Sequence, residues 1–183
     1  AVLGAGPIGN LVGQAARAAG ARVLMTDVSE YRLEIAKTCG FQSVSLAGRE
    51  TLKDASARVF GAKGFQKAFE CAGAEAAINE AIDAIQKGGT IVAVGVYGDR
   101  PRVNMGLVQD RELTLTGTLM YQKRDFVKAV RLMRSGALVT APLETAHFPF
   151  EEYRAAYDFA DREGERSMKI FVDLGTDRQE RDS

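Results

Sequence analysis

The sequence contains few of the residues that build metal centres and disulfide frameworks. Its 183 residues include two cysteines, Cys39 and Cys71, and a single histidine, His147. No Cys-x-x-Cys pair occurs, whereas a catalytic zinc needs three protein ligands that converge. We therefore expect neither a disulfide framework nor metal ligands in this chain. His147 stands in an extended or turn segment before a proline, where a structural or exposed histidine is more common than one that contacts a cofactor or a subunit.

Excess charge of one sign and long apolar runs are also missing. Lysine and arginine together number 24, as do aspartate and glutamate, so no overall field would attract a nucleic acid. No window approaches the roughly 18 uninterrupted apolar residues of a membrane span, and the first residues lack the pattern of a targeting signal. The composition, 46% hydrophobic and 26% charged, is typical of a globular protein. We expect a cytoplasmic protein with one full domain.

The most informative segment is the start of the chain. Its first ten residues, Ala-Val-Leu-Gly-Ala-Gly-Pro-Ile-Gly-Asn, place a Gly-x-Gly-x-x-Gly loop directly after an apolar run. Such a loop indicates a dinucleotide site where a strand precedes it, a helix follows it and an acidic residue closes a second strand about 20 residues on. Val2 and Leu3 fit the first strand, and Asp27 follows the apolar run 22–26. Apolar residues at helical spacing predict the helix and its buried face: Ile8, Leu11, Val12, Ala15, Ala16 and Ala19.

The three glycines and the acidic residue each have a physical role in such a site. Gly4 permits the tight turn, Gly6 lets a pyrophosphate approach the backbone, and Gly9 lets the helix pack closely on the sheet. The positive end of the helix dipole then faces the phosphates. Asp27 can accept a hydrogen bond from a ribose 2′-hydroxyl and repels a 2′-phosphate, so the pattern favours NAD over NADP. From the residues alone, Arg32 fits stacking on adenine and a solvated position equally well.

The rest of the chain alternates between strand and helix patterns, which predicts an α/β fold with a doubly wound, parallel, six-stranded sheet. Strands are predicted at 41–46, 65–71 and 90–94, and helices at 29–38, 51–60 and 74–86. Segment 112–117 alternates with period two, which predicts a half-exposed edge strand suited to pairing with another subunit in a homo-oligomer. Amphipathic helices around 126–133 and 153–160 and a strand at 168–172 follow, and the charged tail 175–183 is expected to be disordered.

Several motifs, in order along the chain, resemble a known family. They are Gly4-Ala-Gly-Pro-Ile-Gly9, Thr26-Asp-Val-Ser-Glu-Tyr-Arg32, Phe69-Glu-Cys-Ala-Gly73, Gly88-Gly-Thr-Ile-Val92, Leu115-Thr-Gly-Thr118 and Ala146-His-Phe-Pro149. Together they are similar to the zinc-dependent medium-chain alcohol dehydrogenases, and within them to the branch of sorbitol, butanediol and threonine dehydrogenases. The resemblance implies a Rossmann domain over residues 1–138 and a segment 139–174 that returns to pack on a catalytic domain.

Carried over position by position, the resemblance implies cofactor-binding residues and no catalytic ones. The pyrophosphate turn would consist of Gly4, Gly6, Pro7, Ile8 and Gly9, with Ile8 also near the nicotinamide. Asp27 and Arg32 would bind the adenosine side. The backbone of six further residues would line the riboses and the amide: Cys71, Ala72, Val94, Gly95, Thr118 and Met120. The residue types themselves favour a small buried Cys71 over a redox or ligand role.

The resemblance implies the NAD-binding part of a zinc-dependent oxidoreductase that transfers hydride between a polyol or secondary alcohol and NAD. In that family a preceding catalytic domain holds the zinc and the proton relay, so this chain alone is expected to bind NAD and to be inactive. A first strand of about three residues is short for a core strand, and Ala1 is expected to lie inside a longer polypeptide. The alternatives are a glycine turn that binds no nucleotide, a free-standing NAD-binding or redox-sensing module, and a zinc-free quinone or enoyl reductase.

Overall fold

The computed structural model describes residues 1–175 of the chain. They divide into two compact units, the first formed by Ala1–Val139 and the second beginning at Thr140. Each unit has its own β-sheet, with six strands in the first and two in the second. The tail predicted to be disordered is 175–183, and all of it except Gly175 lies outside the described residues.

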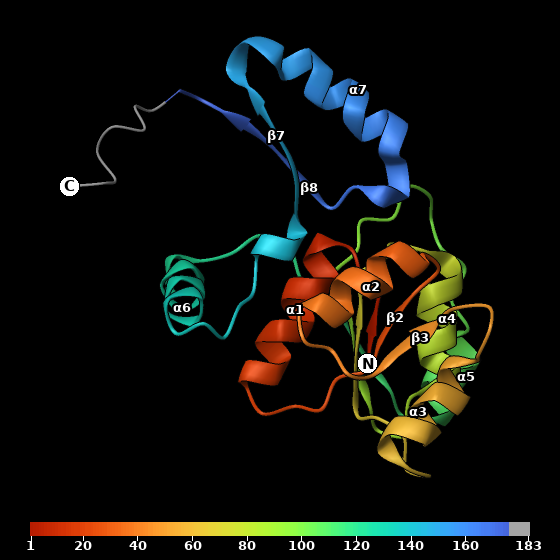
Figure 1. Ribbon diagram of the computed structural model, residues 1–183. Helices are drawn as coiled ribbons and strands as arrows, with labels where there is room; N and C mark the ends of the chain where they lie inside the picture. The colour runs from red at the N-terminus through yellow and green to blue at the C-terminus, as the bar shows by residue number, and fades with distance from the viewer. Residues whose placement is uncertain (176–183) are drawn as a thin grey trace. The chain divides into compact units, whose positions relative to one another are not determined.

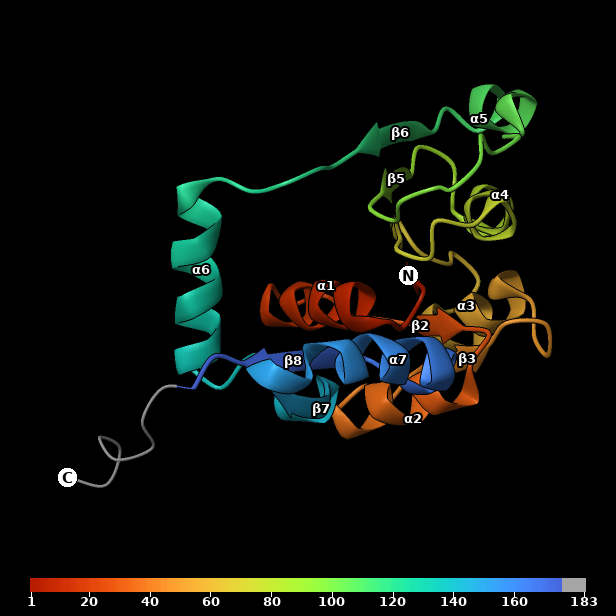
Figure 2. The same ribbon diagram turned by 90° about the horizontal axis from the view of Figure 1, so that it is seen from above.

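The sheet of the first unit is entirely parallel, with the strand order β3-β2-β1-β4-β5-β6. Its strands are β1 (Val2–Leu3), β2 (Met25–Asp27), β3 (Val44–Leu46), β4 (Lys67–Glu70), β5 (Thr90–Ala93) and β6 (Thr114–Gly117). Its helices are α1 (Pro7–Ala18), α2 (Glu30–Thr38), α3 (Leu52–Phe60), α4 (Glu75–Ala84), α5 (Met105–Asp110) and α6 (Lys123–Arg134). Helices α1 and α2 cover one face, and α3, α4 and α5 cover the other (Figure 1, Figure 2). The predicted doubly wound fold is confirmed.

Capping residues explain where the helices of the first half begin. The Ser29 side chain accepts a hydrogen bond from the N–H of Arg32 at the start of α2, and Thr51 accepts one from the N–H of Asp54 at the start of α3. Gly61, with φ of 85°, ends α3 in a conformation that favours glycine. These starts and stops agree with the predicted helices 29–38 and 51–60.

The hydrophobic core of the first unit lies between the sheet and helices α3 and α4. Leu3 of β1 and Ile91 of β5 are at most 2% exposed, and Leu52 and Ala55 of α3 pack in the same cluster. The helix predicted at 74–86 buries four residues against this cluster: Ile78, Ala81, Ile82 and Ile85. Burial of each larger side chain stabilises the fold by about 1.5–3 kcal/mol, so α4 fixes the second half of the sheet.

The predicted buried face of α1 is wrong. The buried residues of this helix are Gly9, Asn10, Gly13 and Gln14, whereas Ile8 is 57% exposed. The reason is close packing, because a Cβ atom at Gly13 would lie 2.7 Å from the ring of Phe41. The helix therefore packs against the sheet through the face that carries Gly9 and Gly13. The face that carries Ile8 points away from this close contact.

The segment after β5 contains two departures from the predicted pattern. Helix α5 was not predicted; Asn104 begins it by accepting a hydrogen bond from the N–H of Leu107. Strand β6 is the predicted edge strand, but all four of its residues are exposed instead of one face only.

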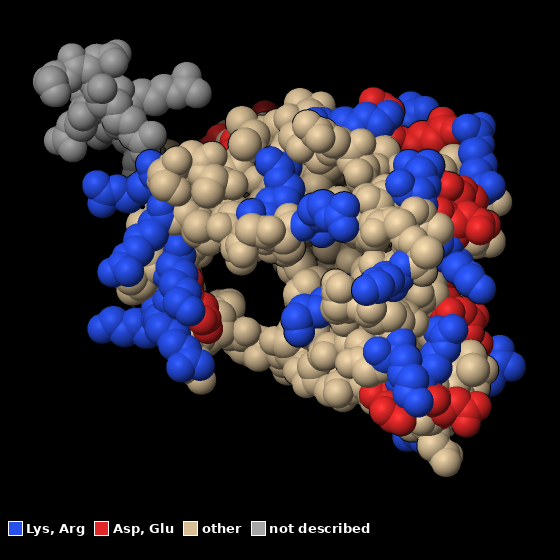
Figure 3. All heavy atoms as spheres, turned by 90° about the horizontal axis from the view of Figure 1, so that it is seen from below, with Lys and Arg blue, Asp and Glu red and all other residues tan. Residues whose placement is uncertain are grey.

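Helix α6 is the predicted amphipathic helix, yet its apolar residue Phe126 is 56% exposed. Basic side chains gather over α6 in Figure 3.

The second unit is built on two parallel strands, β7 (Glu144–Pro149) and β8 (Lys169–Asp173), joined through α7 (Tyr153–Glu163). Short 3-10 turns lie at Ala141–Leu143, Phe150–Glu152 and Gly164–Arg166. The predicted helix around 153–160 and the strand at 168–172 are confirmed. Across the residues that the structure describes, no helix has the length and apolarity needed to cross a membrane.

Candidate functional site

The glycine-rich loop joins the end of β1 to the first turn of α1, and two of its glycines are required by packing. Gly4 has φ of 100°, and a Cβ atom there would lie 2.9 Å from the backbone nitrogen of Ala72. A Cβ atom at Gly9 would lie 1.8 Å from the carbonyl oxygen of Gly4. Both positions therefore exclude side chains because the loop, α1 and the turn after β4 are in backbone contact.

Gly6 differs from its two neighbours in the motif. Its φ of −61° and ψ of −179° are open to any residue, and among the described residues no atom beyond Gly6 and its two chain neighbours lies within 4 Å of the position of a Cβ. Pro7 follows at the start of α1, whose N-cap has no side-chain hydrogen bond and whose first turn has no acidic residue. The helix N-terminus is thus left available to an anion, and Gly6 leaves the space beside it open.

Asp27 is the last residue of β2 and is only 6% exposed. Its Oδ2 accepts a hydrogen bond of 2.6 Å from the N–H of Ala5, and its Oδ1 accepts one of 2.8 Å from the N–H of Ser29. The carboxylate therefore holds the glycine-rich loop against β2. Each carboxylate oxygen has two acceptor positions, so capacity for a ribose hydroxyl remains.

A pocket of about 360 Å³ lies at the carboxyl ends of β1, β2 and β4. It brings together six of the predicted site residues: Gly4, Gly6, Asp27, Arg32, Cys71 and Ala72. The Nε of Arg32 is buried with no hydrogen-bond partner among the described residues. The pocket coincides with the switch point of the strand order, where doubly wound sheets bind their ligands.

The structure does not bring the remaining predicted residues into this pocket. Ile8 projects outward from α1, and Met120, with φ of 63°, is 74% exposed beyond β6. Val94 and Gly95 follow β5 in the neighbouring turn, where both N–H groups donate to the carbonyl of Glu70. Thr118 is bonded through its N–H to Ala93. The predicted set therefore divides into three groups: the pocket residues, the residues after β5 and β6, and Pro7, Ile8 and Gly9 in the first turn of α1.

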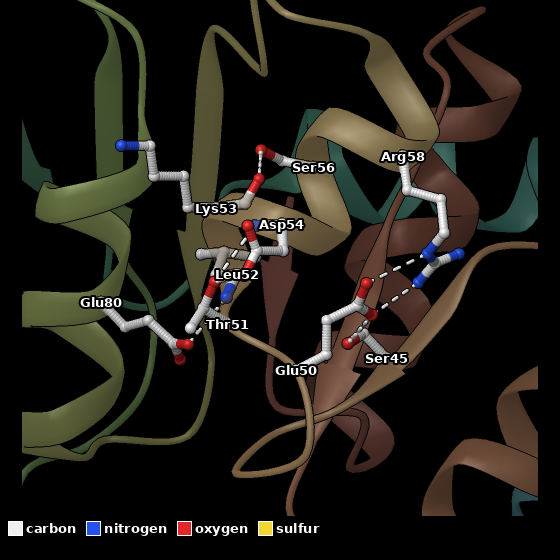
Figure 4. A network of polar contacts seen from close by, with 9 residues as sticks. All are labelled: Ser45, Glu50, Thr51, Leu52, Lys53, Asp54, Ser56, Arg58 and Glu80. Carbon is white, nitrogen blue, oxygen red and sulfur yellow. Dashed lines mark hydrogen bonds and ion pairs between the residues drawn. The ribbon is translucent and has the colours of Figure 1, made fainter.

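Polar contacts beside the pocket support its outer wall. Glu80, which lines the pocket from α4, accepts a hydrogen bond of 2.9 Å from the N–H of Leu52 at the start of α3 (Figure 4). Glu50 accepts two hydrogen bonds from Arg58 and one from Ser45, and the Arg58 guanidinium holds the pKa of Glu50 below its usual range (Figure 4). These contacts fix α3 and the loop after β3 without adding a catalytic group.

Neither cysteine has the properties of a nucleophile or a metal ligand. Burial, together with the charge of Glu70, raises the pKa of the Cys71 thiol to about 12, so this thiol is protonated at neutral pH. Cys39 is 2% exposed, and burial raises its pKa as well. Over residues 1–175, no group of three or more His, Cys, Asp or Glu side chains is placed to hold a metal ion.

Two buried side chains near the pocket were missed by the sequence reasoning. Gln14 of α1 donates to the carbonyl of Val139 at 2.9 Å and accepts from the N–H of the same residue at 2.6 Å. Its amide also donates to Asn10, which is fully buried. Polar residues one helical turn apart within an apolar stretch were the available signal, because a buried amide needs such partners.

The fold, the switch-point pocket and the loop define a doubly wound α/β domain built around a glycine-rich βα turn. The family model for zinc-binding dehydrogenases matches residues 7–135. Sorbitol dehydrogenase 1 of Saccharomyces cerevisiae is 33% identical over 178 residues, which are 93% of this chain and 50% of the relative. The chain belongs to the zinc-binding dehydrogenase family. It spans about half the length of the curated relatives that it matches.

Solved structures agree with this assignment. L-idonate 5-dehydrogenase of Escherichia coli matches with a TM-score of 0.82 and 26% identity over 94% of this chain and 49% of that chain. At 21% and 22% identity, an E. coli alcohol dehydrogenase complexed with NADH and a Sinorhizobium meliloti zinc-binding dehydrogenase bound to NADP share the fold, with TM-scores of 0.83 and 0.82. Each match covers 94% of this chain and 51% of the other.

Proposed function

We propose that this chain is the NAD-binding part of an enzyme that transfers hydride between a polyol or secondary alcohol and NAD. The observation that carries the proposal is the contrast among the glycines of the loop. The fold itself requires Gly4 and Gly9. Gly6, in contrast, leaves a space at the N-terminus of α1 that the non-adjacent described residues do not fill. A pyrophosphate that contacts the backbone explains why this position carries no side chain.

The pocket supports the adenosine half of the same cofactor. Asp27 would accept hydrogen bonds from the adenosine ribose, and the unpaired Nε of Arg32 fits a guanidinium that contacts the base or the ribose. The bound cofactor supplies the hydride acceptor, and the chain orients it and keeps water from the adenosine side. None of these residues takes part in bond breaking, so we propose that the chain by itself binds cofactor and is inactive.

The choice of NAD over NADP rests on Asp27 and the two residues after it. A carboxylate repels the 2′-phosphate of NADP, and Val28 and Ser29 provide no cation to offset it. Solved neighbours contain NADH in one case and NADP in another, so the fold is compatible with either cofactor. Local charge at Asp27 favours NAD.

The relatives guide the proposed substrate class. The named relatives act on sorbitol, threonine or idonate, which are secondary alcohols or polyols. Among the described residues, no group of His, Cys, Asp or Glu side chains is placed to hold a metal ion, so the proposed role of this chain includes no zinc ligand. Strand β6 is the outer strand of the sheet, and its exposed residues support a homo-oligomer that forms along this edge.

Calorimetric titration of this chain with NAD and, separately, NADP tests the proposal. Substitution of Asp27 by alanine would leave the N–H groups of Ala5 and Ser29 unpaired, which would lower the stability of the fold by about 1–3 kcal/mol for each. Loss of binding in that variant could then not be separated from loss of folding. Val28→Arg is a cleaner variant, because Val28 is 69% exposed and lines the pocket. Val28→Gln has similar length without the charge and serves as its control.

We expect the unchanged chain to bind NAD and to bind NADP at least about tenfold more weakly. Val28→Arg should gain NADP affinity by about tenfold, since one charge-assisted hydrogen bond contributes about 1.5–3 kcal/mol. Val28→Gln should leave the preference unchanged. Preference of the unchanged chain for NADP would refute the argument from Asp27 and favour the zinc-free reductase alternative. Binding of neither cofactor would refute the dinucleotide assignment.

A further inference from the structure

Glu70, the last residue of β4, is a fully buried carboxylate to which the proposed cofactor contacts give no role. Its Oε1 accepts hydrogen bonds of 2.9 and 2.8 Å from the N–H groups of Ala72 and Gly73. Its Oε2 accepts a hydrogen bond of 2.7 Å from the hydroxyl of Tyr97, 27 residues further along the chain. One side chain therefore joins the turn after β4 to the loop after β5.

The main chain of Glu70 adds to the same connection. Its carbonyl oxygen accepts hydrogen bonds from the N–H groups of Val94 and Gly95, at 2.8 and 2.9 Å. The two turns also touch directly, because a Cβ atom at Gly95 would lie 2.2 Å from the backbone nitrogen of Gly73. The turns after β4 and β5 thus form one wall, with Glu70 bonded to both sides of it.

The place of this wall in the sheet indicates which part of the cofactor it meets. Leu3 of β1 pairs with Thr26 of β2 on one side and with Glu70 of β4 on the other. Asp27, next to Thr26, accepts two backbone N–H groups in the first half of the fold, as Glu70 does in the second half. A dinucleotide spans the two halves, and the acidic residue of the first half marks the adenosine. Cys71 and Ala72 of the turn after β4 line the adenosine pocket, whereas Val94 and Gly95 of the turn after β5 do not. The part of the wall that lies on the nicotinamide side is therefore the turn after β5.

We propose that Glu70 and Tyr97 act as a positioning pair that holds the turn after β5 in place for the nicotinamide half of the cofactor. The inference rests on the proposed function, because it assumes that the chain binds a dinucleotide. Tyr97 suits this task, since burial and its hydrogen bond to Glu70 hold its pKa above the usual range and keep the phenol as a donor. Neither residue touches reacting atoms, so neither is a catalytic residue.

The test compares a whole cofactor with its adenosine half. Tyr97→Phe removes the hydroxyl and keeps the ring, which packs against the core. The Kd values of NADH and AMP are measured by NADH fluorescence and by calorimetry. Glu70→Gln keeps an oxygen acceptor for the turn and an amide for Tyr97, so it is the conservative variant. Ser56→Ala, which removes a buried hydroxyl bonded to the carbonyl of Lys53, controls for a general loss of stability.

We expect Tyr97→Phe to weaken NADH binding by about tenfold, the effect of about 1.4 kcal/mol, and to leave the Kd of AMP within twofold. Glu70→Gln, as a single variant, should bind NADH with a Kd within about threefold of that of the unchanged chain. Ser56→Ala should change neither Kd. Equal weakening of NADH and AMP, or no weakening of either, would refute the positioning pair while the proposed function stands. Failure of the unchanged chain to bind either molecule would instead refute the proposed function and this inference with it.

Discussion

Substitution of Gly6 by alanine separates the requirements of the fold from those of the cofactor. Gly6 has φ of −61° and ψ of −179°, which alanine adopts without strain. Apart from the atoms of its chain neighbours, a methyl group at this position would meet no atom of residues 1–175 within 4 Å. We therefore expect Gly6→Ala to fold normally and to lose cofactor binding.

The two effects have opposite signs and can be bounded. Replacement of a glycine by alanine in a compatible conformation stabilises a protein by about 0.4–1 kcal/mol, because the unfolded chain loses freedom. For a chain of this size that corresponds to a rise in Tm of about 1–4 °C. A methyl group in the space reserved for a phosphate should lower NAD affinity at least about tenfold, or about 1.4 kcal/mol.

Two other glycines provide the matched controls. A Cβ atom at Gly9 would lie 1.8 Å from the Gly4 carbonyl oxygen, so Gly9→Ala should lower stability by about 1–3 kcal/mol or more. Gly106 lies in the first turn of α5, where a Cβ atom would be 3.5 Å from the Asn104 side chain. Gly106→Ala should therefore raise Tm by a similar amount to Gly6→Ala and leave NAD binding unchanged.

The assay combines thermal unfolding, followed by circular dichroism, with calorimetric titration of NAD. We expect Tm and the affinity for NAD to change in opposite directions in Gly6→Ala and in neither of the two control variants. Binding of NAD by Gly6→Ala with the affinity of the unchanged chain would refute the idea that the cofactor backbone occupies this space. A fall in Tm of several degrees would show that Gly6, like Gly9, is required by the fold.

Three further predictions concern other parts of the chain. Gln14→Leu removes both hydrogen bonds to the backbone of Val139, so denaturant unfolding should show a loss of about 1–3 kcal/mol. Cys71 should resist a thiol reagent at pH 7 until denaturant is added, since burial raises its pKa to about 12; modification of the native chain at the rate of a free thiol would contradict this. The hydrogen bond that His147 donates to Asp173 raises the pKa of His147, so the contribution of this residue to the β7–β8 pairing should be complete below the pKa of the imidazole in the unfolded chain and lost as pH rises through its pKa in the folded chain. An NMR titration of this single imidazole should show its pKa fall toward the usual value in Asp173→Asn.

The fold and the centre of the site could be predicted because their signals are local. The glycine spacing, the two-residue apolar run before it and the acidic residue at the end of β2 all fall within the first 27 residues. A parallel α/β sheet imposes one order on such signals, so a few of them determine the topology. The structure places Gly4, Gly6 and Asp27 around one pocket, as this order requires.

The buried face of α1 could not be predicted, because apolar periodicity gives no weight to glycine. Gly9 and Gly13 are buried because the helix backbone comes close to the sheet, and the buried amide of Gln14 has hydrogen-bond partners in Asn10 and Val139. Helix α5 was missed for a related reason. It has six residues and buries only Val108, so it carries no periodic signal.

The proposed nicotinamide side of the site was harder to predict because its geometry depends on contacts between distant turns. Glu70 and Tyr97 are 27 residues apart, and neither stands in a pattern that would link it to the other. The glycines of this region, Gly73 and Gly95, exclude side chains because their turns touch each other. In the proposed function, Gly6 excludes one because of a ligand. Alanine at a glycine required by backbone contacts should lower the stability of the protein, whereas alanine at a glycine required by the ligand should lower only cofactor binding. The reason for each glycine can therefore be measured one position at a time.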